Sequence, residues 1–199
     1  MDIQLFAVVE GYTDRVIVEK LIFETGLSLA AASFGGHGKG FINKNLSKYN
    51  MAARSSFWLV LRDLDHDAEC APLLKKQLLP HPEDGMCFCI AVREIEAWLM
   101  ADTETFSQFM SVPRTSIPNN PEWLDNPKAT IVNLAFKSRD RGIKIDMTPE
   151  SGSKRKEGPA YASRLAEFAL KHWRPKEAAK KCESLKYCLD KLRALKNLE

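Results

Sequence analysis

The chain has 199 residues, 45% of them hydrophobic, which suits one domain with a buried core, with or without a helical extension. No apolar run approaches the ~20 residues that a membrane-spanning helix needs, and residues 1–4 lack the basic start of a signal peptide, so we expect a cytoplasmic protein without membrane partners. The five cysteines follow no paired metal-binding spacing, which favours buried or free thiols in a reducing compartment.

The net charge of +3 is unevenly distributed along the chain. Residues 1–102 carry 10 Lys and Arg against 14 Asp and Glu, a net charge of −4, whereas residues 103–199 carry 19 against 12, a net charge of +7. The acidic half suits a carboxylate site, and the basic half suits phosphate groups. Lys-rich helices that serve only solubility are an equally good explanation of the basic half.

Strands and helices alternate in the first half of the chain. Apolar runs predict strands over 4–9, 27–34, 56–62 and 86–92. Between them we predict a helix over 13–23, a glycine-rich turn over 35–40, a helix that ends near residue 53, a helix over 71–79 and a helix start over 94–100. This alternation predicts an α/β fold with a mostly parallel four-stranded sheet flanked by helices.

The pattern changes in the second half. Four prolines within residues 112–127 indicate a loop or boundary, and residues 146–159 form a polar segment. Helices are predicted over 128–139, 161–173 and 176–198, and both Trp58 and Trp98 are expected in the core. The last helix has an apolar stripe, which favours packing on the sheet over a surface for a partner helix. We therefore predict a core over 1–111 and a mostly helical C-terminal extension over 112–199, packed on that core.

Acidic residues follow two of the predicted strands. Glu10 and Gly11 follow the first strand, and Asp63 and Asp65 follow the third. Because the carboxyl ends of parallel strands share one edge of the sheet, we expect these acids to meet there. Asp14, one helical turn further on, would face back toward Glu10. Two or three carboxylates are enough to bind Mg²⁺ or Mn²⁺, so a metal site is predicted, although acids at strand ends also cap helices and favour turns.

This arrangement resembles the TOPRIM domain of topoisomerases, primases and related nucleases. The resemblance rests on Glu10-Gly11 closing the first strand and on Asp63-x-Asp65 closing a later one. Residues 10–14 are similar to the Glu-x-x-x-Asp form of the overcoming-lysogenization-defect (OLD) nucleases, and residues 35–39 to the glycine–lysine turn of that group. Residues 91–102 look like a signature of small stand-alone bacterial TOPRIM-like proteins, so the resemblance spans residues 4–102.

The resemblance implies a role for each matching residue. Glu10 would serve in acid–base chemistry, and Asp63 and Asp65 would bind Mg²⁺, with Asp14 and Glu96 as further metal ligands. Gly11 and Lys39 are candidates for phosphate binding, because flexible glycines let a backbone approach a phosphate group. Glu94 and Glu96 are open to a second explanation, since acids at a helix start also complement the helix dipole. Arg62 and Arg93 lie beside acids, which favours ion pairing, and His37 and His66 are expected to be solvated.

The expected function is therefore a Mg²⁺-dependent nuclease that acts on DNA or RNA. By analogy with the OLD nucleases, it would work in bacterial phage defence beside a separately encoded ATPase. One alternative is a non-catalytic metal- or nucleotide-binding module that acts through a partner protein. Another is a receiver-type domain with Asp63 as phospho-acceptor, which fits less well because such a domain would want an acid pair after the first strand.

Overall fold

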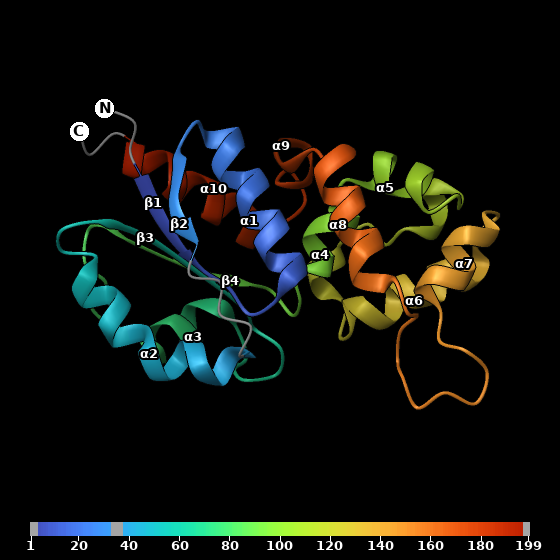
Figure 1. The fold of residues 1–199 in the computed structure, drawn as a ribbon, viewed down its shortest axis with the longest axis horizontal. Coiled ribbons are helices and arrows are strands. Elements are labelled where there is room, and N and C mark those ends of the chain that lie inside the picture. Colours follow the sequence, from blue (N-terminus) through green and yellow to red (C-terminus); the bar gives the residue numbers. More distant parts are fainter. Residues whose placement is uncertain (1–3, 33–37, 197–199) are drawn as a thin grey trace. The chain divides into compact units, whose positions relative to one another are not determined.

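The computed structural model describes residues 4–32 and 38–196, and these residues form two compact units. Unit 1 contains residues 1–92 and 183–199, and unit 2 contains residues 93–182, so unit 2 interrupts unit 1 in the sequence. The division falls at 92/93 and 182/183 rather than at the predicted 111/112 boundary. The division at 182/183 arises because the last helix, coloured red in Figure 1, packs with the sheet of unit 1.

The sheet of unit 1 has four parallel strands, which confirms the predicted α/β class. They are β1 (Gln4–Val8), β2 (Ser28–Ala32), β3 (Phe57–Asp63) and β4 (Met86–Ala91), in the spatial order β2-β1-β3-β4. In the register of β1 with β3, Val8 pairs with Val60, and in that of β3 with β4, Asp63 pairs with Ala91. The four strands match the predicted positions, except that residues 33 and 34 of the second prediction lie outside the described residues.

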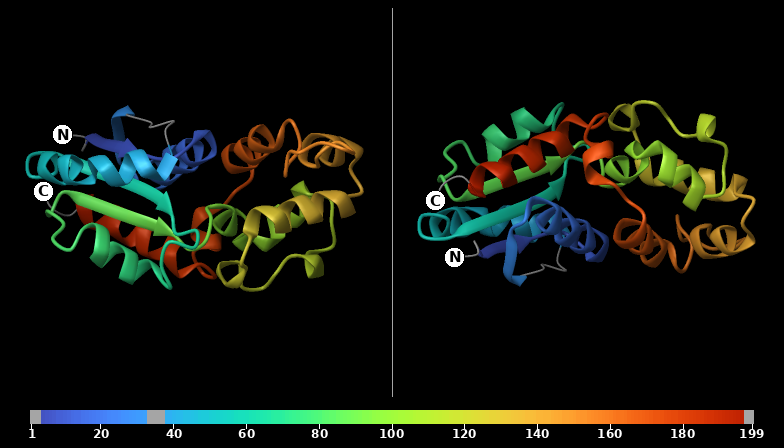
Figure 2. Two further views of the ribbon diagram at one scale, coloured as in Figure 1. Left: turned by 90° about the horizontal axis from the view of Figure 1, so that it is seen from below. Right: turned by 90° about the horizontal axis from the view of Figure 1, so that it is seen from above.

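Helices cover both faces of this sheet (Figure 1). On one face lie α1 (Tyr12–Thr25) and α10 (Glu183–Lys196), and on the other lie α2 (Gly38–Ala52) and α3 (Ala71–Leu78). Because both faces are covered, the strand interiors are apolar throughout, as in other parallel sheets. Helix α10 runs along β4 in both views of Figure 2, so its apolar stripe packs on the sheet, as predicted.

Unit 2 is helical. Its helices are α4 (Glu96–Ala101), α5 (Thr103–Phe109), α6 (Pro127–Lys137), α7 (Arg141–Met147), α8 (Tyr161–Lys171) and α9 (Pro175–Ala178), with single 3₁₀ turns over Arg114–Ser116 and Pro121–Trp123. Its core contains Trp98 and Trp173, and the indole N–H of Trp173 donates to the Trp98 carbonyl at 3.2 Å. The prediction that Trp98 is a core residue is thus confirmed.

Several local predictions were wrong. Residues 38–40 form the first turn of α2 rather than part of a glycine turn, and residues 33–37 lie outside the described part of the chain. The helix predicted over 176–198 is two helices, α9 and α10, separated by residues 179–182. Trp58 is half-buried and stacks on Phe6 and Tyr49 instead of lying in the core. The short helices α5 and α7 were not predicted.

All five cysteines are free thiols, and four of them are buried: Cys87, Cys89, Cys182 and Cys188. Cys87 and Cys89 share one face of β4, as predicted, with their sulfur atoms 3.5 Å apart. In the part of the chain that is described, no helix is long and apolar enough to cross a membrane.

A thiol reagent such as DTNB is therefore expected to modify one cysteine rapidly in the native protein and all five after unfolding. The fast thiol is Cys70, which is exposed, whereas burial shields the other four. Absorbance at increasing urea concentrations measures both phases, and Cys70→Ser serves as the control that removes the fast one. A second fast thiol in native protein would contradict the structure.

Candidate active site

Glu10 and Asp63 meet at the carboxyl edge of the sheet, although 53 positions separate them in sequence. Strands β1 and β3 are parallel neighbours, so the residues that follow them emerge at the same edge. The backbone N–H of Asp63 donates to Oε1 of Glu10 at 3.1 Å. The parallel register thus joins the two acidic segments that the sequence placed on separate strands.

The surroundings of Glu10 favour its protonated form. Burial raises the pKa of the Glu10 carboxyl group above its ordinary value, and the negative charges of Asp14 and Asp65 raise it further. The N–H of Asp63 and the charge of Arg62 act in the opposite direction, but they do not cancel the increase. A carboxyl group with a raised pKa is better matched than an ordinary one to moving a proton near neutral pH.

Asp14 caps the first helix as well as facing Glu10. It lies in the first turn of α1, and its Oδ2 accepts the N–H of Gly11 at 2.7 Å. That N–H therefore already has a partner, and the phosphate-binding role of Gly11 stays a prediction. A Cβ at Gly11 would lie 3.4 Å from the Asp14 carboxylate, an ordinary van der Waals contact, so the local packing does not require glycine there.

Lys39 reaches the same region from the first turn of α2. Its ammonium group lies 2.7 Å from Oδ2 of Asp65 and 2.8 Å from Oδ1 of Asp67. Asp65 has a φ of 48°, in the left-handed region, which non-glycine residues rarely adopt and which often marks a functional turn. The sequence suggested phosphate binding by Lys39 but gave no sign of this contact, because 26 residues separate Lys39 from Asp65.

Arg62 anchors the turn that carries the aspartates. Its side chain is fully buried, and it donates from Nε to the Asp63 carbonyl at 2.9 Å and from one terminal nitrogen to Asn43 Oδ1 at 2.9 Å. Its other terminal nitrogen pairs with Asp67. The predicted ion pairing is confirmed, but the anchoring role was missed. The position of this charged residue at the end of an apolar strand was a sequence feature that could have indicated the anchoring role.

Asp67 pairs with both Lys39 and Arg62. Burial alone would raise the pKa of Asp67, but hydrogen bonds from Lys39 and Arg62 outweigh it and hold that pKa below its ordinary value. Asp67 therefore stays ionised. His66, in the same turn, is exposed, as predicted, whereas His37 lies outside the described residues.

Glu96 belongs to unit 2, where it forms part of a local network. It is buried, its Oε1 accepts the Tyr161 hydroxyl at 3.3 Å, and the Lys128 ammonium group lies 3.7 Å away. Burial raises the pKa of Tyr161, and the negative charge of Glu96 adds to the effect. Glu94 accepts the backbone N–H of Lys128 at 2.8 Å. The structure thus brings the Glu10, Asp14 and Asp65 carboxylates near the backbone of Asp63 in unit 1, and the metal-ligand roles of Asp63 and Glu96 stay predictions.

The site of unit 1 fits a hard divalent cation in its chemistry. The candidate ligands are all carboxylates, which Mg²⁺ and Mn²⁺ prefer, and the like charges around Glu10 would be relieved by a cation. The Lys39 ammonium group lies 2.7 Å from Asp65 and 2.8 Å from Asp67. Among the described residues, however, no three His, Cys, Asp or Glu side chains are arranged to hold a metal ion. Binding would require these carboxylates to close around the ion.

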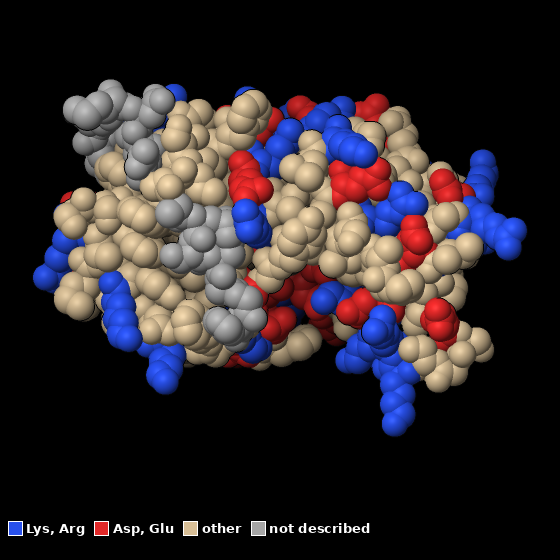
Figure 3. Space-filling view, in the orientation of Figure 1, with Lys and Arg blue, Asp and Glu red and all other residues tan. Residues whose placement is uncertain are grey.

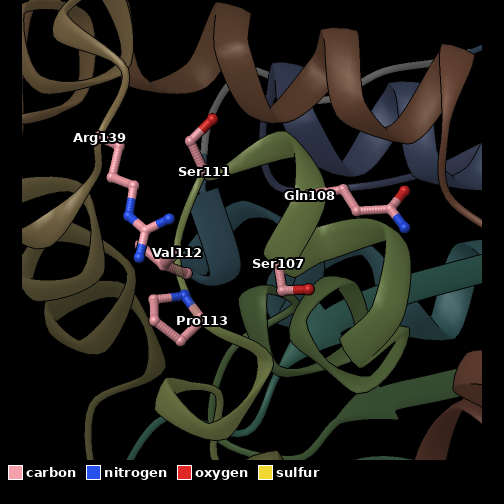
Figure 4. Close-up of a pocket in the computed structure, with 6 residues that line it drawn as sticks. All are labelled: Ser107, Gln108, Ser111, Val112, Pro113 and Arg139. Carbon is pink, nitrogen blue, oxygen red and sulfur yellow. The ribbon is translucent and has the colours of Figure 1, made fainter.

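Two surface pockets are weaker candidates for a ligand site than the carboxylate site is. One of about 410 Å³ in unit 2 is lined by Ser107, Gln108, Ser111, Val112, Pro113 and Arg139. In Figure 4 the Arg139 guanidinium lies beside Val112 and Pro113, whereas the side chains of Ser107 and Gln108 point away from it. The other pocket, of about 440 Å³, lies at the opposite edge of the sheet, beside the starts of β3 and β4. In the first pocket the polar side chains do not converge, and in the second the Arg54 guanidinium is already paired with Glu83 at 2.8 Å.

No protein-family model matches the chain, and no curated protein or solved structure with which it was compared matches it either. The residues and geometry of the carboxylate site are therefore the basis for a proposed function.

Proposed function

We propose that this protein is a Mg²⁺- or Mn²⁺-dependent nuclease with a TOPRIM-type carboxylate site that hydrolyses phosphodiester bonds in DNA or RNA. The observation that supports it most is the meeting of Glu10 with the Asp63 backbone at the carboxyl edge of the sheet. Ligand and catalytic sites of open parallel sheets lie at this edge. A group of acids around a carboxyl group of raised pKa suits the handling of protons beside a cation.

Each residue has a defined role in this proposal. Asp63 and Asp65 would hold the cation, which when bound would polarise the scissile phosphate. Glu10 moves a proton to or from the attacking water or the leaving oxygen. Asp14 caps α1 and keeps negative charge beside Glu10, which favours proton uptake by that carboxyl group. Arg62 fixes the position of the Asp63 carbonyl, and through it the turn that carries the carboxylates.

Unit 2 carries a cluster of exposed cations that would bind nucleic-acid phosphates. Lys154, Arg155 and Lys156 are exposed on the loop between α7 and α8, where Lys and Arg side chains project at the lower right of Figure 3. Clustered cations of this kind bind phosphates without regard to sequence, so the proposal includes both DNA and RNA as substrates.

The cellular setting is inferred from the TOPRIM resemblance alone. It suggests a cytoplasmic protein of bacterial phage defence that works with a separately encoded ATPase. A second candidate is a non-catalytic metal- or nucleotide-binding module that acts through a partner. One observation favours this alternative: Asp65, a proposed metal ligand, is already paired with the Lys39 ammonium group at 2.7 Å.

Cleavage assays with the full chain test the proposal. Labelled single- and double-stranded DNA and RNA are incubated with Mg²⁺, Mn²⁺ or EDTA, using the wild-type protein and Asp63→Ala. We expect cleavage that needs the metal and falls by at least about 10²-fold in the variant, because loss of a ligand removes charge stabilisation at the phosphate. Asp84→Ala, which changes an exposed acid near the opposite edge of the sheet, is the control and should cleave like the wild type.

Cleavage by Asp63→Ala at the wild-type rate would contradict the proposed site. Metal binding without cleavage, followed by cleavage once a separately encoded ATPase partner is added, would favour the partner-dependent module.

A further inference from the structure

Lys39 lies where a helix disfavours a cation. It is the second residue of α2, and the N-terminal turn of a helix carries a partial positive charge that favours acids. The first turn of α2, which is wholly within the described residues, contains no acidic side chain. The helix dipole therefore disfavours a lysine at this position, and its contacts with Asp65 and Asp67 offset that effect.

The two cations of the site are held very differently. The Arg62 side chain is fully buried and fixed by contacts with Asn43, Asp67 and the Asp63 carbonyl. The Lys39 side chain is 38% exposed, so it has a path to solvent. A lysine is also a compact charge on a flexible stem. Lys39 can therefore withdraw from Asp65 without disturbing the buried anchor, whereas Arg62 cannot.

Lys39 contacts both Asp65 and Asp67, and Asp67 is also paired with the buried Arg62. If Lys39 withdraws, Asp67 keeps its pairing with Arg62. Asp65 would then lose the 2.7 Å contact while still close enough to Glu10 to raise that residue's pKa. The repulsion between these two carboxylates would increase, and a divalent cation would relieve it better than the single charge of an ammonium group does.

We propose that Lys39 is a built-in cation that holds Asp65 in the metal-free protein and is displaced from it when a divalent metal ion binds. This inference rests on the proposed metal site. It makes the Lys39–Asp65 contact and metal binding competitors for the same carboxylate. Because such coupling is reciprocal, weakening the contact must strengthen metal binding.

Mn²⁺ titration of the full-length protein, followed by the electron paramagnetic resonance signal of free Mn²⁺, tests the competition. Lys39→Met removes the charge and keeps most of the side-chain length. We expect it to bind Mn²⁺ about tenfold more tightly than the wild type, within the usual range of coupling between two sites. Lys44→Met changes another lysine of α2, which is exposed, and should bind like the wild type.

Thermal unfolding separates this role from a purely structural one. Without metal, Lys39→Met should melt below the wild type, because Asp65 and Asp67 lose a cation. Saturating Mn²⁺ should raise the melting temperature of Lys39→Met by more than that of the wild type. An equal deficit with and without Mn²⁺ would mean that Lys39 only stabilises the fold, which overturns the inference.

The outcomes also separate this inference from the proposed function. Equal or weaker Mn²⁺ binding by Lys39→Met overturns the displacement. The metal site itself survives that result if the wild type binds Mn²⁺ and Asp63→Ala does not. If neither the wild type nor Lys39→Met binds Mn²⁺ at millimolar concentrations, both the displacement and the proposed metal-dependent function fail.

Discussion

Glu10→Gln is expected to lower metal-dependent cleavage by about 10²- to 10⁴-fold, the usual contribution of a general acid or base. Glutamine keeps the oxygen that accepts the Asp63 N–H, so the link between the ends of β1 and β3 is preserved. What it loses is the proton that Glu10 gives and takes. Single-turnover cleavage rates at saturating Mn²⁺ measure the effect. Glu19→Gln, in an exposed ion pair with Arg15 on α1, is the control and should be nearly neutral.

The stability of the metal-free variant shows whether Glu10 is structural. The pKa of Glu10 is raised in the folded protein, so the fold favours the protonated form, and ionisation of Glu10 with rising pH destabilises it. Glutamine cannot ionise. Glu10→Gln should therefore be at least as stable as the wild type at pH 7, and any gain should vanish below the ordinary carboxyl pKa of 4.5. Lower cleavage caused by partial unfolding would contradict the catalytic role.

Trp98→Ala should lower the free energy of unfolding by about 3–5 kcal/mol, the usual cost of removing a large aromatic side chain from a core. Trp98 is fully buried in α4, and its carbonyl accepts the indole N–H of Trp173, so the cavity would form beside a second large side chain. Urea unfolding followed by far-ultraviolet circular dichroism, which reports on the helices of both units, measures the loss.

Trp123→Ala provides a matched control because it removes the same side chain from the surface of the same unit. Trp123 is 84% exposed, and we expect a change within about 0.5 kcal/mol. Similar losses for the two variants would mean that Trp98 does not lie in a close-packed core.

The strands, and the meeting of the acids, could be predicted because both follow from local pattern. Apolar runs such as 57–61 mark strands that are buried on both faces, and alternation with helices implies that they are parallel. Parallel strands end at one edge, so the proximity of Glu10 and Asp63 needed no knowledge of the tertiary structure. The same reasoning gave the packing of the last helix on the sheet, because its apolar residues recur at helical spacing.

The remaining features depend on contacts that no local pattern records. The contacts of Lys39 with Asp65 and Asp67 join a residue of α2 to the turn after β3. Local sequence does not indicate these contacts, because the helix dipole disfavours a lysine at a helix start. The break between α9 and α10 was missed because no glycine or proline lies between residues 176 and 199. It coincides with a tertiary contact in which the buried Cys182 thiol donates to the Ala97 carbonyl.

Unit 2 is inserted in the sequence between the two segments of unit 1. The N–H of Val92 donates to the Ser184 hydroxyl oxygen at 3.2 Å, so the polypeptide leaves the sheet unit and re-enters it at adjacent points. Residues 93–182 are therefore an insertion between β4 and α10. The C-terminal segment that begins at residue 183 belongs instead to the sheet unit. Truncation from residue 183 onward would remove α10, which covers β4, and would expose the interior of the sheet. Deleting this C-terminal segment would therefore remove part of the hydrophobic core.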